Sequence, residues 1–296
     1  VSSALLAHTT DLELVIRHVL AGLGQGVHAG RERGAGVEFS EYRAYAPGDE
    51  WRRVDWKLLA RADRYYVREA ERDSHVAVWL LLDASASMAE PSRSIGGLDK
   101  LGYARTLLAC IAAIAQRQGD AFGLAVLSAG RVQFLPAARG PRQLQRVLAK
   151  LKQVQAGGEL PNADVLRTGL RFTASPSLLF AATDFLDWPS SLSDALIRLR
   201  HMRHDVRAVC LQTEAECEGS FDSGPAYRDP ERDASVFRFG ADLREGYLRN
   251  REAHFASVTA SLRANDVLHV AARIEQAPGE VLRQWLRQRL GNGARR

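Results

Sequence analysis

Residues 76–87 read Val-Ala-Val-Trp-Leu-Leu-Leu-Asp-Ala-Ser-Ala-Ser, an apolar run followed by alternating polar side chains. The apolar part, Val76–Leu82, has the length of a strand, and its lack of polar positions indicates burial on both faces. A second run of this kind is Leu178–Ala182, and helical patterns such as Lys100–Gln118 lie between the two. Strands that alternate with helices predict an α/β fold whose mostly parallel sheet is covered by helices on both faces.

An aspartate follows each of the two apolar runs. Asp83 is followed by Ser85 and Ser87 at alternating positions, and Asp184 comes shortly after the second run. In parallel sheets ligands bind beyond the carboxyl ends of the strands, where these side chains would meet. Carboxylate and hydroxyl oxygens suit a hard divalent cation, with water or a partner's carboxylate completing an octahedron. The sequence therefore predicts a site for Mg²⁺ or Mn²⁺.

The chain is predicted to have two parts. Residues 1–74 contain an amphipathic helix, Asp11–Leu23, followed by a small irregular and β segment that packs on the main domain. Residues 75–296 form the α/β domain. Within that domain the polar stretch Glu214–Ser235 contains Gly and Pro, so we expect a loop there.

Composition indicates a globular protein with a mild excess of positive charge. The net charge is +5 and the isoelectric point is about 9.3. Three cysteines are too few for a disulfide framework, which favours a reducing compartment, and we expect a cytoplasmic location. No apolar run approaches the ~20 residues of a membrane span.

Several basic side chains gather near the C-terminus: Arg283, Arg287, Arg289, Arg295 and Arg296. They leave peripheral contact with an anionic membrane, or with nucleic acid, as an alternative. A solvated helix face is the simpler interpretation, and no motif for nucleic-acid binding accompanies the arginines, so we expect no nucleic-acid partner.

The pattern Asp83-x-Ser85-x-Ser87 resembles the metal-ion-dependent adhesion site of von Willebrand factor A domains. The resemblance implies a doubly wound sheet, with Asp184 as the final element of the site. It also implies a threonine loop near residues 157–162, where this chain has Glu159 in place of the threonine. Glu159 would either be a fifth ligand, which makes the site more acidic, or point away and leave the site incomplete.

A block upstream of residue 70 carries a narrower resemblance. Its motifs are Gly36–Phe39, Tyr42-Arg43, Pro47-Gly48-Asp49, Arg52–Lys57, Ala60-Arg61 and Tyr66–Glu69. This block is similar to the signature of the bacterial domain-of-unknown-function 58 family, a von Willebrand A-like group, and the likeness extends from about Gly30 to Leu290. The resemblance implies a partner, a MoxR-type AAA+ ATPase, and an unknown client protein.

Two functions are consistent with these residues. The leading hypothesis is a non-enzymatic, metal-linked adaptor or scaffold that works with the ATPase in protein assembly or maturation. The alternative is a metal-dependent hydrolase with Asp83 and Asp184 as ligands. No general base for such a hydrolase can be identified in the sequence. The chain also has no P-loop, so the chain itself is not predicted to be an ATPase.

Overall fold

The computed structural model describes residues 12–27, 41–44, 66–69, 77–170, 176–221, 226–228, 236–238 and 243–287. The chain forms two compact units, one of residues 1–26 and 76–296 and the other of Val27–His75. Sequence analysis grouped all of residues 1–74 as one part. The structure instead assigns the N-terminal helix to the same unit as the sheet, because its buried face joins the core of that unit.

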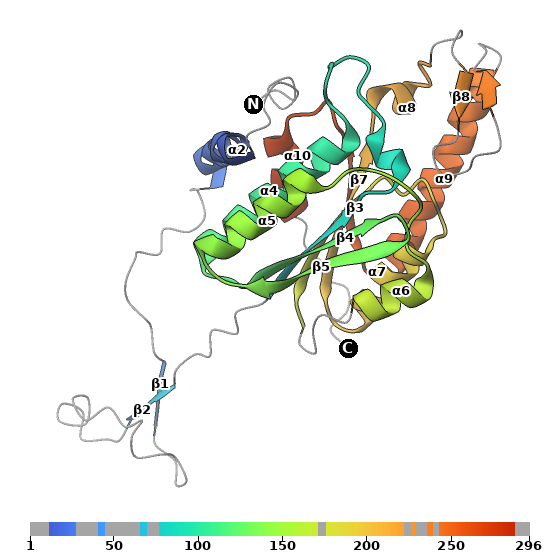
Figure 1. The fold of residues 1–296 in the computed structure, drawn as a ribbon. Coiled ribbons are helices and arrows are strands. Elements are labelled where there is room, and N and C mark those ends of the chain that lie inside the picture. Colours follow the sequence, from blue (N-terminus) through green and yellow to red (C-terminus); the bar gives the residue numbers. More distant parts are fainter. Residues whose placement is uncertain are drawn as a thin grey trace. The chain divides into compact units, whose positions relative to one another are not determined.

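A six-stranded sheet forms the centre of the larger unit, in the order β10-β7-β6-β3-β4-β5 (Figure 1). Its strands are β3 (Val78–Asp83), β4 (Phe122–Ser128), β5 (Arg131–Ala138), β6 (Leu178–Thr183), β7 (Asp205–Gln212) and β10 (Leu268–Arg273). Only β5 is antiparallel to its neighbour; the other pairs in this sheet are parallel. The fold class predicted from the sequence is confirmed.

Helices cover both faces of this sheet. One face packs against α2 (Leu12–Val27), α4 (Lys100–Gln118), α5 (Pro141–Gln153) and α10 (Pro278–Arg287). The other face packs against α6 (Ala163–Gly169), α7 (Ser191–His201) and α9 (Arg244–Ala264). A hydrophobic core lies on each face of the sheet, and β3 contributes side chains to both. Leu80 and Leu82 belong to one core, and Trp79 and Leu81 belong to the other. This explains why its sequence is apolar without alternation.

The chain changes direction across the sheet beside β3. From β3 it continues to β4 and β5 on one side, and β6, β7 and β10 then extend the sheet on the other side. The boundary between β3 and β6 is therefore the topological switch point, where the connections leave a crevice at the carboxyl ends of the strands. The fold places the ends of the two predicted aspartate-bearing strands side by side at this point.

The stretch predicted as a loop, Glu214–Ser235, has more structure than expected. It begins with the short helix α8 (Glu214–Glu218), whose capping box is formed by Thr213 and Glu216. It also contains β8 (Ala226–Arg228), which pairs with β9 (Val236–Arg238) in a small antiparallel sheet. The loop prediction was wrong for these segments because a single helical turn and three-residue strands are too short to leave a periodic pattern.

In the smaller unit, β1 (Glu41–Ala44) pairs with β2 (Tyr66–Glu69) in an antiparallel ladder. The other signature residues, from Gly36 to Arg61, lie outside the described residues, as do Arg289, Arg295 and Arg296. Among the helices in the described part of the chain, none combines the length and apolar character that a bilayer crossing requires.

Candidate functional site

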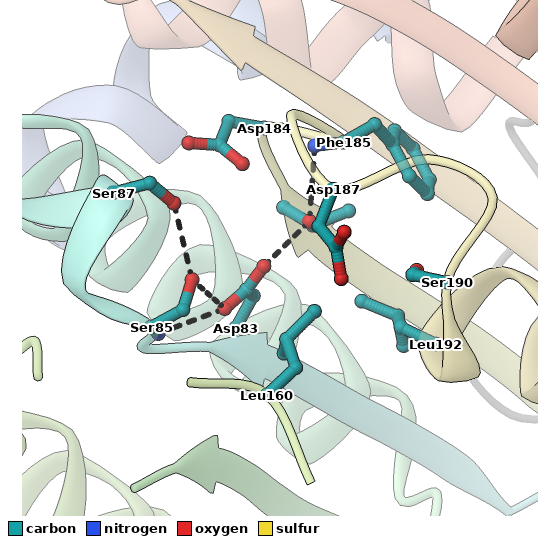
Figure 2. Close-up of a pocket in the computed structure, with 10 residues that line it drawn as sticks. Asp83, Ser85, Ser87, Leu160, Asp184, Phe185, Asp187, Ser190 and Leu192 are labelled. Carbon is teal, nitrogen blue, oxygen red and sulfur yellow. Dashed lines mark hydrogen bonds between the residues drawn. The ribbon is translucent and has the colours of Figure 1, made fainter. Parts of the chain in front are cut away.

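The carboxyl ends of β3 and β6 bring the predicted residues together. Asp83 is the last residue of β3, Ser85 and Ser87 lie in the turn after it, and Asp184 follows β6. All four line one pocket (Figure 2). Ser85 is the N-cap residue of the short 3₁₀ helix Ala86–Ala89, and its hydroxyl faces Asp83 while the Ser87 hydroxyl faces Ser85.

Hydrogen bonds link the side chains on the β3 side of the pocket. Asp83 Oδ1 accepts from the Ser85 amide at 2.9 Å and from Ser85 Oγ at 2.7 Å. Ser85 Oγ lies 3.2 Å from Ser87 Oγ. On the other side, Thr183 Oγ1 donates to Asp83 Oδ2 at 2.6 Å and accepts from the Phe185 amide at 3.2 Å. The result is a connected row of oxygen atoms from Ser87 to Thr183, and Figure 2 shows the part of it from Ser87 through Ser85 to Asp83.

The charge on Asp83 is unfavourable where it lies. The side chain belongs to a residue that is 1% exposed. Burial, followed by the charge of Asp184, raises the pKa of Asp83 to about 7, although hydrogen bonds from Thr183 and Ser85 act in the opposite direction. A cation beside this carboxylate would remove the penalty, because an opposite charge stabilises the ionised form.

Asp184 has a different environment, because a lysine already pairs with it. Lys100 Nζ lies 3.1 Å from Asp184 Oδ2 and 2.6 Å from Glu216 Oε1, and the lysine side chain is 0% exposed. Burial alone would lower the pKa of Lys100, but the two carboxylates outweigh it and the pKa lies above its ordinary value. Lys100 therefore stays charged. Among the described ion pairs at this edge, both involve Lys100 and neither involves Asp83.

Glu159 is placed near the site but not in it. The loop before it is joined to the turn after β3, since the Ala86 amide donates to the Gly158 carbonyl at 2.9 Å and the Gly157 amide to Ala84 at 3.0 Å. The Glu159 side chain is exposed and does not line the pocket, whereas the next residue, Leu160, does. The structure thus does not bring the Glu159 carboxylate together with Asp83.

Sequence reasoning missed three side chains of this edge: Thr183, Lys100 and Glu216. Thr183 directly precedes a predicted ligand, and the register Leu82↔Ala182 puts it beside Asp83. Lys100 is a charged residue at the start of a largely apolar helix, which is a signal for a buried charge. Glu216 carried no comparable signal, because a short helix in a polar stretch did not stand out.

The comparison with protein families decides which group this chain belongs to. Residues 41–257 match the model described as "Protein of unknown function DUF58". The chain is a member of the DUF58 family. The resemblance drawn from the signature block is confirmed. Another protein similar to this DUF58 chain, the uncharacterized protein Mb1516 of Mycobacterium bovis, is 30% identical over 268 residues, which is 88% of this chain and 81% of the relative.

Two solved structures are also similar to this DUF58 chain. BatB from Bacteroides thetaiotaomicron has a TM-score of 0.43 and 15% sequence identity, covering 72% of this chain and all of that one. The SpRpn10 VWA domain has a TM-score of 0.42 and 10% identity, covering 74% of this chain and 98% of that one.

The donor set of this DUF58 site fits a hard divalent cation in its chemistry. Asp83 offers a buried carboxylate in need of a positive partner, and Ser85 and Ser87 offer neutral oxygens next to it. Within the described residues, no three His, Cys, Asp or Glu side chains are grouped to hold a metal ion. A cation here would be held by Asp83 and the serine hydroxyls, with Asp187 as a further carboxylate in the pocket lining and without Glu159.

Replacing Glu159 by threonine in this DUF58 chain is expected to have little effect. Because the side chain is exposed, the change in the free energy of unfolding should stay within about 0.5 kcal/mol. The gain in melting temperature on adding Mg²⁺ should be the same as for the wild-type chain. Paired melting curves with and without the cation check this, and a clearly larger metal response in Glu159→Thr would mean that Glu159 blocks the site.

Proposed function

We propose that this chain is a non-enzymatic interaction protein that holds a partner through a divalent cation. Mg²⁺ or Mn²⁺ would be bound by Asp83, Ser85 and Ser87, and an acidic side chain of the partner would complete its coordination. The observation that carries the proposal is the buried Asp83 carboxylate, hydrogen-bonded to a serine hydroxyl but without a described cationic partner, at the switch point of the sheet. A bound cation would supply the missing positive charge.

The family resemblance suggests the partner. We propose a MoxR-type AAA+ ATPase, with the chain acting as an adaptor or scaffold in the assembly or maturation of a client protein. A cytoplasmic location is part of this proposal, and the free state of Cys110, Cys210 and Cys217 is consistent with a reducing compartment. The hydrolase alternative gains no support from the pocket, whose lining contains no histidine, cysteine or lysine among the described residues.

Thermal unfolding tests the cation. Ligand at about 100 times its dissociation constant stabilises by about 2.7 kcal/mol. We therefore expect saturating Mg²⁺ or Mn²⁺ to raise the melting temperature of the wild-type chain by roughly 5–10 °C. Asp83→Asn should abolish the gain, while Asp164→Asn, the same change at an exposed position on α6, should keep it. Equal gains in Asp83→Asn and wild type would disprove the site.

Co-purification tests the partner. A MoxR-type ATPase from the same organism should be retained by the immobilised chain in Mg²⁺, released by EDTA, and retained again when Mg²⁺ is restored. Asp83→Asn should lose this dependence on the cation. Retention that is equal with and without EDTA would leave an adaptor but exclude binding through a metal.

A further inference from the structure

A positively charged side chain of the protein already lies at the edge of the sheet where the site is. The Lys100 ammonium lies between the carboxylates of Asp184 and Glu216, fully buried, at 3.1 and 2.6 Å. Both oxygens of Asp184 are engaged, since Oδ2 faces Lys100 and Oδ1 accepts from the Leu186 amide at 3.2 Å. Asp184 therefore has a cationic partner within the fold, whereas Asp83 accepts hydrogen bonds from Ser85 and Thr183 and is in no described ion pair.

Lys100 is held in this position from both ends. It is the first residue of α4, directly after the capping Asp99, whose side chain accepts from the Gly102 amide. On the far side, Glu216 is fixed by Thr213, whose amide donates to Glu216 Oε2 at 2.7 Å. A cation that displaced the ammonium from Asp184 would leave a buried charge with one partner fewer, which is costly.

Lys100 offsets negative charge at one end of this edge. It pairs with Asp184 and Glu216, whereas the pocket lining also contains the carboxylates of Asp83 and Asp187. The ammonium sits at the Asp184 end of the cluster, so the positive charge still needed is at the Asp83 end.

We propose that Lys100 is an internal counter-ion that keeps Asp184 out of the coordination sphere of the bound cation. This inference rests on the proposed cation site and specifies its ligands: Asp83 and the hydroxyls of Ser85 and Ser87, without Asp184. A cation that lacks the Asp184 carboxylate as a ligand is bound more weakly, because affinity rises with the number of charged ligands. A cation bound without Asp184 also keeps more of its positive charge for an acidic group of the partner. Lys100 therefore lowers the affinity for the cation and strengthens the recognition of an acidic partner.

A pair of variants tests the role of Lys100 without changing the net charge of the chain in the decisive variant. Lys100→Met/Glu216→Gln has the same net charge as wild type, but its Asp184 is free to bind the cation. Glu216→Gln alone keeps the Lys100–Asp184 pair and is the matched control. Mn²⁺ binding, measured by the loss of the free-ion electron paramagnetic resonance signal, should be about tenfold tighter in the double variant than in the control or in wild type.

The wild-type chain offers a second measurement that needs no substitution. The chain has four lysines, Lys57, Lys100, Lys150 and Lys152, so side-chain ¹⁵N spectra are simple. A buried, paired ammonium exchanges its protons slowly, and the signal of Lys100 should persist when Mg²⁺ saturates the site. Loss of that signal on adding Mg²⁺ would show that the cation displaces Lys100 from Asp184, and would overturn the inference.

The outcomes separate this inference from the proposed function. Asp83-dependent binding of Mn²⁺ by wild type, with no gain in the double variant, would refute the role of Lys100 and leave the cation site standing. Binding by the double variant alone would support the role of Lys100 but refute the proposed function of the wild-type site. Binding by neither would refute both.

Discussion

In the absence of divalent cations, the stability of this chain is expected to fall as the pH rises from about 4 to about 7. The pKa of Asp83 is raised in the folded protein from 3.8 to about 7. Between these values the folded state holds a proton that the unfolded state has lost, so raising the pH favours unfolding. At about 1.4 kcal/mol for each pKa unit, the loss attributable to Asp83 is on the order of 4 kcal/mol, complete above the folded-state pKa.

Chemical denaturation across this pH range measures the effect, and Asp83→Asn isolates it from other titrating groups. Between pH about 4 and about 7, the free energy of unfolding of wild type should fall relative to that of Asp83→Asn by about 4 kcal/mol. Saturating Mg²⁺ should abolish most of the shift, because a cation favours the ionised carboxylate and lowers its pKa. A wild-type chain whose stability does not fall relative to Asp83→Asn in metal-free buffer would contradict the raised pKa.

Much of the fold was readable from the sequence because its strands are apolar throughout. The run Val76–Leu82 corresponds to β3, displaced toward Asp83, and Leu178–Ala182 corresponds to β6 with Thr183 added. Burial on both faces leaves no alternation to interpret, so length and flanking residues decide. The order of the strands was not readable, because it depends on which apolar faces meet after the chain has folded.

The residues of the candidate site at the carboxyl end of β3 were predicted from the sequence, whereas the ion pairs of Lys100 beside them were not. Asp83, Ser85 and Ser87 lie within five residues, so a turn at the strand end is enough to bring them together. Lys100 and Glu216 are far apart in the sequence and meet only because α4 begins at the edge where β7 ends and α8 follows. Ion pairs of this kind follow from tertiary structure, and local patterns do not reveal them.

The boundary drawn at residue 74 shows the same limit. The helix near the N-terminus was correctly predicted from its apolar spacing, and α2 buries that face. Which surface it covers could not be inferred, and it was grouped with the signature segment that follows it. In the structure its buried residues share a core with α10, where a Cβ atom on Gly279 would lie 4.0 Å from Val19 Cγ1.

A charge placed on the buried face of α2 should therefore destabilise the sheet unit. Val15 is 1% exposed and belongs to the main core, so Val15→Asp would put an unpaired carboxylate among apolar side chains. We expect a loss of about 3–5 kcal/mol in the free energy of unfolding, comparable to leaving a buried charge without a partner. The melting temperature should fall by roughly 6–20 °C.

The adjacent residue provides the control. Leu14 is 49% exposed on the same turn of α2, and Leu14→Asp introduces the same charged side chain without burying it. Its effect should stay within about 0.5 kcal/mol. Equal melting temperatures for Val15→Asp and Leu14→Asp would show that α2 is not part of the core, and the grouping of residues 1–74 as a separate part would then be restored. A large difference would establish that the sheet unit begins before the signature segment, which is then an insertion between α2 and β3.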